Sequence, residues 1–192
     1  SFWMMPRVAQ FRLVHPDTEV HLIASAVADA GTDEAEDVAV LFGTRSDFGA
    51  DATQLFEECV YPVCSPHFAA RHGLTDEPRA IAALPLLHLD STPHPRWFAW
   101  SDWFAAMHVA RESGPGDLSL NTYGLVVQAA IADQGVALGW AGLIDGAIAD
   151  GTLVAAGPPL ARAESGYWVR PGLEPSTPAL GLIEWIISTA RR

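Results

Sequence analysis

The stretch Asp37-Val38-Ala39-Val40-Leu41-Phe42, ended by Gly43, decides the class of fold. Its apolar residues run without alternation, which is typical of a strand covered on both faces, because a solvated face would place a polar residue at every second position. Before it, the periodicity predicts a helix over 4–14, stopped by His15-Pro16-Asp17, and an alternating strand over 19–24. A helix and two strands joined by an acidic crossover predict a parallel α/β sheet.

The rest of the chain continues this alternation of strands and helices, without an internal repeat. We expect strands at 55–64, 85–90, 117–120, 136–140, 153–156 and 167–170, and helices at 65–72, 79–83, 97–107, 122–134, 143–149 and 178–190. Pro62 inside the first of these strands suits a sheet edge or a segment that crosses between two lobes. Either Asn121 or Thr122 is expected to cap the helix that follows it.

Composition and charge exclude several classes of protein. The chain has 192 residues, of which 49% are apolar and 18% charged, as in globular proteins. All 11 basic residues are Arg and the net charge is −12, so the chain alone is predicted to bind neither DNA nor RNA. Schiff-base chemistry and a P-loop are excluded by the absence of Lys. No apolar run approaches the ~18 residues of a membrane span, and no leader pattern supports secretion.

Cys59 and Cys64 are predicted to be reduced. An odd separation on one strand puts them on opposite faces and ~16 Å apart, whereas a disulfide needs Cα atoms within about 7 Å. Two free thiols are typical of a cytoplasmic protein. Buried, inert thiols are the favoured interpretation, and a redox role stays open.

A search for catalytic motifs predicts that the protein is not an enzyme. The sequence has no Gly-x-Ser-x-Gly, Gly-x-Gly-x-x-Gly or His-Glu-x-x-His pattern. His67 and His72 would lie about 140° apart on a helix, so no metal site is expected. Nothing in the spacing favours Ser65 or Ser119 as a nucleophile. His88 lies in an apolar strand, where a structural role is favoured over one in a ligand cleft.

The aromatic segment 97–104 has two interpretations. Helical spacing places Trp97, Trp100 and Phe104 on one stripe. This stripe could line an apolar or cationic ligand site, or pack the helix onto its sheet. Packing is favoured for most of these residues, and less so for Trp97, which stands beside a loop.

Residues at the predicted strand ends favour a small-molecule site. In an open parallel sheet, ligands bind beyond the carboxyl ends of the strands, where helix N-termini suit carboxylates. Here those positions hold small, hydroxyl-bearing, acidic and aromatic residues: Phe42-Gly43, Ser65, Leu89-Asp90, Asn121-Thr122 and Trp140-Ala141.

The order of motifs along the chain resembles the effector-binding domain of LysR-type transcriptional regulators, in the subgroup that activates glycine cleavage and β-lactamase expression. The resemblance covers essentially the whole chain and rests on Trp3-Met-Met-Pro-Arg-Val8, Phe11, His15-Pro16-Asp17, Asp37–Gly43, Pro62-Val-Cys-Ser-Pro66, Leu84–His88, Trp97 with Trp100, Gln128-Ala-Ala130, Gly135–Leu138, Asp150–Val154 and Tyr167-Trp-Val169.

The resemblance implies a type II periplasmic-binding-protein fold, with two Rossmann-like lobes, a double crossover and a cleft between them. Lobe I is placed at 1–62 and 165–192, without the family's first strand, and lobe II at 63–164. The effector-binding residues carried over to this chain are Ser1, Phe42, Gly43, Ser65, His88, Asp90, Trp97, Thr122, Tyr123 and Trp140. The loop 44–53 departs from the subgroup's pattern, so no contacts are transferred there.

The implied function is to sense a small-molecule effector, such as a carboxylate or an amino-acid-like metabolite, and to form a homodimer or homotetramer. No cofactor and no membrane partner are expected. DNA contacts would require a helix-turn-helix domain that this sequence does not contain. The alternative is a solute-binding protein that feeds a transporter, and the gene sequence upstream of Ser1 distinguishes the two.

Overall fold

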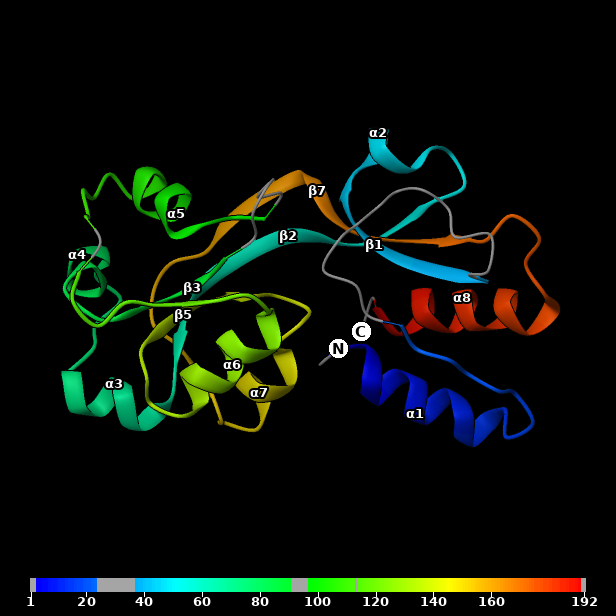
Figure 1. The fold of residues 1–192 in the computed structure, drawn as a ribbon, viewed down its shortest axis with the longest axis horizontal. Helices are drawn as coiled ribbons and strands as arrows, with labels where there is room; N and C mark the ends of the chain where they lie inside the picture. The colour runs from blue at the N-terminus through cyan, green and yellow to red at the C-terminus, as the bar shows by residue number, and fades with distance from the viewer. Residues whose placement is uncertain (1–2, 24–36, 91–96, 113, 191–192) are drawn as a thin grey trace. The chain divides into compact units, whose positions relative to one another are not determined.

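The computed structural model describes residues 3–23, 37–90, 97–112 and 114–190. These residues form two compact units: unit 1 comprises those of Ser1–Glu58 and Arg162–Arg192, and unit 2 is formed by Cys59–Ala161. The chain passes between the units twice, within β2 (Thr53–Cys64) and within β7 (Leu160–Pro171), both labelled in Figure 1. The passages follow residues 58 and 161, whereas the expected lobe boundaries were 62 and 164.

The described part of unit 1 contains three helices, the strand β1 and parts of the strands β2 and β7. β1 pairs with β7, and β7 lies next to β2. α8 packs against α1 and against β1, and Figure 1 shows the two helices side by side. The Phe11 ring meets the Trp185 ring edge-on at 6.2 Å, and Arg7 donates to the Thr189 carbonyl at 3.0 Å. The elements not yet bounded are α1 (Met4–Val14), β1 (Val38–Thr44), α2 (Arg45–Phe48) and α8 (Thr177–Ala190).

Two expectations for unit 1 are wrong. β1 pairs antiparallel to β7, so the sheet is mixed and not wholly parallel. Residues 19–23 form no strand, and the Leu22 and Ile23 side chains are exposed. Alternation of polar and apolar side chains indicates which face of a strand could be buried. A strand also needs a neighbouring strand to satisfy its backbone hydrogen bonds, and this pairing sets whether the two run parallel or antiparallel. Ala24 lies outside the described residues.

Unit 2 contains a sheet with helices on both of its faces. β2 is antiparallel to β5 and to β6, whereas β3 is parallel to both β4 and β5. α6 covers one face of β3, β4 and β5, and α5 lies on the other face (Figure 1). The elements are α3 (Pro66–His72), α4 (Pro78–Ala82), β3 (Leu86–Leu89), α5 (Trp100–Ala106), β4 (Leu118–Leu120), α6 (Tyr123–Ile131), β5 (Val136–Trp140), α7 (Asp145–Ala149) and β6 (Val154–Ala155).

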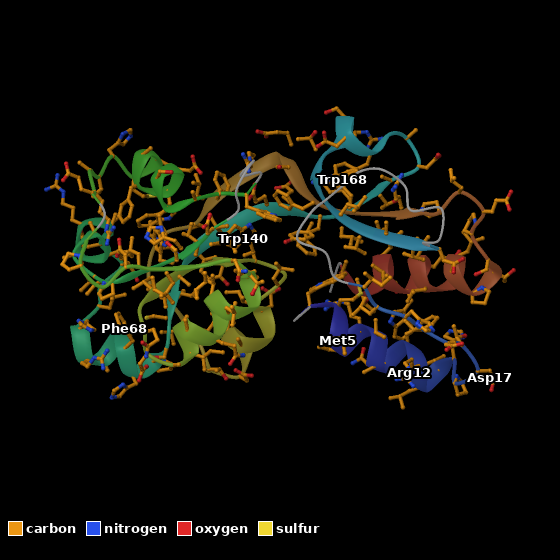
Figure 2. The ribbon with its side chains drawn as sticks, viewed as in Figure 1. Met5, Arg12, Asp17, Phe68, Trp140 and Trp168 are labelled. Carbon is orange, nitrogen blue, oxygen red and sulfur yellow. The ribbon has the colours of Figure 1, made fainter. Side chains whose placement is uncertain are left out.

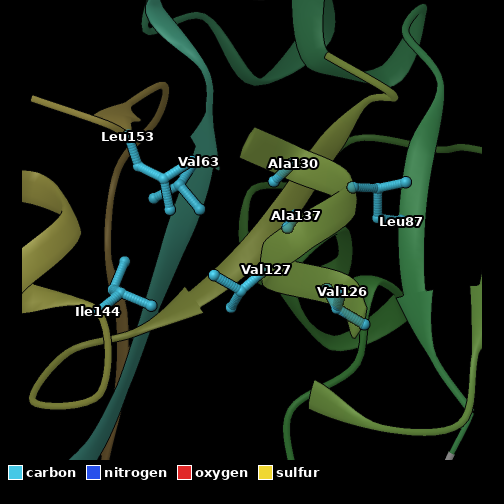
Figure 3. Close-up of a cluster of buried hydrophobic side chains, with 8 residues drawn as sticks. All are labelled: Val63, Leu87, Val126, Val127, Ala130, Ala137, Ile144 and Leu153. Atoms are coloured by element: carbon cyan, nitrogen blue, oxygen red, sulfur yellow. The ribbon is translucent and has the colours of Figure 1, made fainter. Parts of the chain in front are cut away.

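The core of unit 2 lies between α6 and the sheet. Figure 3 shows its buried side chains, which come from three strands, from α6 and from the segments before α7 and β6: Val63, Leu87, Val126, Val127, Ala130, Ala137, Ile144 and Leu153. All five residues of β5 are buried, as in a strand covered on both faces. That cover was expected of the strand at 37–42, but in β1 only Ala39, Phe42 and Gly43 are buried. Pro62 lies opposite Leu138 of β5 and accepts from the Ala156 amide at 2.8 Å, so it is not at a sheet edge.

In the described ranges of the chain, no helix combines the length and the apolar character that spanning a bilayer requires.

Candidate functional site

The carboxyl ends of three parallel strands meet at one edge of unit 2, which we call the carboxyl edge. β3 lies between β4 and β5 and runs parallel to both. Asp90 follows β3, Thr122 follows β4, and Trp140 ends β5. The Asp90 amide donates to the Leu120 carbonyl at 2.8 Å, which joins the ends of β3 and β4. These three candidates therefore come together as the strand-end argument predicted.

Tyr123 and Trp140 form a fixed wall at the carboxyl edge. The Trp140 amide donates to the Tyr123 hydroxyl oxygen at 3.0 Å, and the two rings meet edge-on at 5.0 Å. Trp140, labelled in Figure 2, is 3% exposed. Its ring is therefore almost entirely shielded from solvent.

Thr122 is an exposed polar residue of this edge, as is Asp90. It is the N-cap of α6, and its hydroxyl oxygen accepts from the Leu125 amide at 3.4 Å. The cap was one of the two expected, and it leaves the hydroxyl proton available to a ligand. The first turn of a helix also presents backbone N–H groups that its own carbonyls cannot satisfy, and these groups favour an anion.

His88 lies beside a charged pair. Its Nε2 lies 3.4 Å from Asp117 Oδ2, at the start of β4. Asp117 receives two bonds from the Arg111 guanidinium, at 2.7 and 2.9 Å. Arg111 holds the pKa of Asp117 well below its usual range, and amide donors from Leu86 and Gly114 add to the effect. This geometry gives His88 the structural environment that the sequence favoured.

The space beside His88 is too small for a metabolite. Its cavity has a volume of about 30 Å³, close to one water molecule. The lining is mostly apolar and comes from β3, β5, α6, α5 and the segment before α5: Leu87, His88, Leu89, Phe98, Ala99, Trp100, Val126, Leu138 and Trp140.

The aromatic segment packs onto the sheet, which decides between its two interpretations for most members. Trp100 and Phe104 are 4% and 5% exposed, and Trp100 Nε1 donates to the Leu87 carbonyl at 2.9 Å. The helix begins at Trp100 because Asp102 accepts from the Ala99 amide at 2.7 Å, closing the first turn there. Trp97 therefore precedes α5 and remains partly exposed.

Ser65 lies at the opposite edge of unit 2, so grouping it with the other candidates was wrong. β2 runs antiparallel to β5, and its end lies beside the start of β5. The Ser65 hydroxyl bonds to the Asp133 carboxylate and accepts from the Phe68 amide at 2.9 Å, capping α3. His67 meets the other Asp133 oxygen at 2.7 Å. Because the carboxylate stands between serine and imidazole, this trio lacks the serine–histidine contact of a hydrolase.

Phe42 and Gly43 lie near the end of β1 in unit 1, and Ser1 lies outside the described residues. Phe42 is 6% exposed and meets the Tyr167 ring at 5.1 Å. The Gly43 carbonyl accepts from Trp168 Nε1 at 3.0 Å. A Cβ atom at Gly43 would lie 2.7 Å from the Phe48 ring and from Asp47 Oδ2, so a larger residue there would require these α2 side chains to move.

Unit 1 also holds a polar pocket that the sequence did not predict. Its volume is about 320 Å³, and it is lined by Thr44, Arg45, Ser46, Gln54, Ala163, Glu164 and Trp168. The charged and hydroxyl-bearing residues directly after Gly43 were the available indication. No ligand contacts were expected of these residues, because the loop 44–53 departs from the family's pattern.

The cysteines are unpaired, as predicted. Cys64 is fully buried, and this burial raises the pKa of its thiol to about 11. Within the described ranges, no group of three or more His, Cys, Asp or Glu side chains could hold a metal ion.

Comparisons with known proteins agree with this architecture. The family described as the LysR substrate binding domain matches residues 1–191. The glycine cleavage system transcriptional activator of Escherichia coli K12 is 29% identical over 71% of this chain and 43% of its own length. The transcriptional activator AmpR of Citrobacter koseri is 30% identical over 98% of this chain and 63% of its length. The chain thus spans roughly half of these relatives.

Solved structures show the same fold. The effector domain of AmpR from Pseudomonas aeruginosa superposes with a TM-score of 0.72 at 23% identity, over 98% of this chain and 89% of that domain. The regulatory domain of AphB from Vibrio vulnificus gives a TM-score of 0.67 at 18% identity, over 98% and 92%. The type II periplasmic-binding-protein fold implied by the resemblance is confirmed. The chain belongs to the LysR substrate binding domain family.

Proposed function

We propose that this chain is the effector-sensing and oligomerisation part of a LysR-type transcriptional regulator. The family match over residues 1–191 carries the proposal, and the relatives named above are transcriptional activators. They favour a regulator over a solute-binding protein. We assign DNA binding to a segment of the whole protein that lies outside this chain. A regulator that binds DNA is expected to act in the cytoplasm.

The effector-binding role is assigned to Asp90, Trp97 and Thr122, with Tyr123 and Trp140 as their support, and to Phe42 and Gly43 in unit 1. In unit 2 the proposal rests on the carboxyl edge, where an exposed hydroxyl, a helix N-terminus and a carboxylate come together. These groups suit a small carboxylate or an amino-acid-like effector. Ser65 and His88 are left out, since Asp133 and Asp117 engage them.

Effector binding can be tested by thermal shift with amino acids, small carboxylates, aromatic acids and cationic metabolites. For a compound that raises the melting temperature, Thr122→Ala and Trp97→Ala should each weaken binding, by about tenfold for the lost hydroxyl contact. Thr122→Ser should retain the affinity, and Thr75→Ala, at an exposed threonine of unit 2, should leave it unchanged. Unchanged affinity in both test variants would mean that the carboxyl edge is not the site.

Homodimer formation is proposed from the apolar surface of α1. Leu13 and Val14 are neighbours on this helix and are 83% and 61% exposed. Adjacent exposed apolar side chains are typical of a surface that binds another protein. Sedimentation velocity should show a dimer that Leu13→Glu converts to a monomer, with Leu173→Glu, at an exposed leucine outside the helices, as the control. A monomeric parent chain would contradict the proposal.

The gene sequence upstream of Ser1 tests the regulatory assignment. A continuous reading frame that encodes a winged helix-turn-helix supports it. A secretory leader in that position would overturn it in favour of the solute-binding alternative.

A further inference from the structure

The polar pocket of unit 1 is lined by two opposite charges that form no direct ion pair with each other. Arg45 and Glu164 both line it, and neither has an ion-pair partner within 4 Å among the described residues. At about 320 Å³ the pocket falls in the range of small-ligand sites. A cation and an anion that line one pocket without pairing can each bind the opposite charge of a ligand.

The floor of the pocket is rigid. Trp168, labelled in Figure 2, is 3% exposed and is held by its Nε1 bond to Gly43. The Arg45 guanidinium stands 5.9 Å from the centre of the Trp168 ring, a cation–π contact that directs the side chain over the pocket floor. Thr44 is fixed as well, since both its amide and its hydroxyl donate to Asp47.

The hydrogen bonds already made decide which groups remain for a ligand. Thr44 donates its hydroxyl proton to Asp47, so Ser46 donates to Thr44 at 2.8 Å and keeps lone pairs free. The Gln54 amide donates to the Ala163 carbonyl at 3.5 Å, which leaves its oxygen as an acceptor. The pocket thus offers one strong donor, Arg45, and acceptors on Ser46, Gln54 and Glu164.

From this division we infer that the pocket binds a zwitterionic α-amino acid. Arg45 takes the carboxylate in a bidentate contact, and the ammonium group donates to Glu164 and to the neighbouring neutral acceptors. A simple anion would make no contact with the Glu164 carboxylate, and a simple cation would make none with Arg45, so a ligand with both charges gains more contacts than either. The site uses residues other than those proposed for the effector, so it does not depend on that assignment.

Amide chemical shifts of the ¹⁵N-labelled chain test the inference, with each standard L-amino acid added singly at millimolar concentration. At least one amino acid should shift the amides of residues 44–46, 54 and 163–164. Its carboxamide, which lacks the carboxylate, and its α-keto acid, which lacks the ammonium, should each bind at least about tenfold more weakly.

Variants assign each charge to its partner. Arg45→Ala should weaken the amino acid about tenfold and leave the carboxamide unaffected, whereas Glu164→Gln should weaken the amino acid and leave the α-keto acid unaffected. Arg45 and Glu164 are exposed, so both variants should melt like the parent. Arg12→Ala and Glu57→Gln, at exposed positions outside the pocket, are the matched controls.

Three results would overturn the inference. These are no shift with any amino acid, shifts confined to the carboxyl edge of unit 2, or equal losses for all three compounds in both variants. Thr122→Ala should preserve binding in the pocket, so failure here and failure of the proposed effector site are separate outcomes.

Discussion

Arg111 and Asp117 form the most completely satisfied charge pair among the described residues of unit 2. Their side chains are 8% and 12% exposed. Besides its two bonds to Asp117, Arg111 donates to the carbonyls of Ala82 and Leu84, at 3.0 and 3.1 Å. One guanidinium thus ties the end of α4 and the approach to β3 to the start of β4. Such a pair is costly to break, because the remaining charge stays buried without a partner.

The pH dependence of stability should report on Asp117. Its folded pKa is lowered, so the carboxylate stabilises the fold above the unfolded value, about 3.9, and this contribution is lost as pH falls through the folded pKa. Asp117→Asn should lower the free energy of unfolding by about 3 kcal/mol at pH 7. Below about pH 4 its free energy should fall less steeply than that of the parent. Urea unfolding at a series of pH values measures both, and Asp76→Asn, at an exposed acid, is the control. Parallel curves would contradict this role.

Cys64 should resist modification while the chain is folded. Its burial and its pKa of about 11 leave roughly one thiol in a thousand ionised at pH 8. Iodoacetamide followed by peptide mass spectrometry should show slow alkylation of Cys64, with faster reaction at the partly exposed Cys59. In urea the two should react alike. Rapid alkylation of Cys64 in the folded chain would restore the redox-sensor interpretation.

At the scale of elements, β7 needs glycine where it lies against β2. A Cβ atom at Gly166 would overlap the Phe56 carbonyl oxygen and lie 3.0 Å from Glu57 Cα, and backbone atoms within a sheet cannot move aside. Gly166→Ala should therefore lower the free energy of unfolding by about 2 kcal/mol or more.

Gly146 provides the matched comparison in α7. Apart from its chain neighbours and the backbone of its own helix, no heavy atom lies within 4 Å of a Cβ atom built at Gly146. Gly146→Ala should raise stability by about 0.5–1 kcal/mol, because alanine loses less backbone entropy in a helix. Urea unfolding of both variants measures the contrast, and a harmless Gly166→Ala would mean that β7 and β2 are not packed as described.

Helices and strands with strong local patterns were predicted well. α1 and β5 have the expected bounds, and α6 is capped by Thr122, one of the two expected residues. These features depend on residues close together in the chain, whose periodicity and capping groups are visible without knowledge of the fold. The strand expected at 19–24 was wrong over 19–23, because the same alternation does not supply a backbone partner.

At the scale of the whole chain, the net charge of −12 governs which partners can approach. We predict no binding to duplex DNA, because a protein gains affinity for the phosphate backbone by placing cations against it. Fluorescence anisotropy of a labelled duplex at low and moderate salt measures this. Binding that weakens steeply with added salt would show that the arginines form a basic surface despite the net charge.

The sequence by itself determined the α/β class, the two free thiols, the acidic character and the family, because each depends on composition or on patterns local to a few residues. Only the tertiary structure decided that β1 runs antiparallel to β7 and that β2 runs antiparallel to β5. Because of the second pairing, Ser65 at the end of β2 lies away from Thr122 and Trp140. The tertiary structure also decided that Arg45 and Glu164, 119 positions apart along the chain, line one pocket. Strand direction and the meeting of distant side chains are set by hydrogen-bond pairing and packing through space, which no local period encodes.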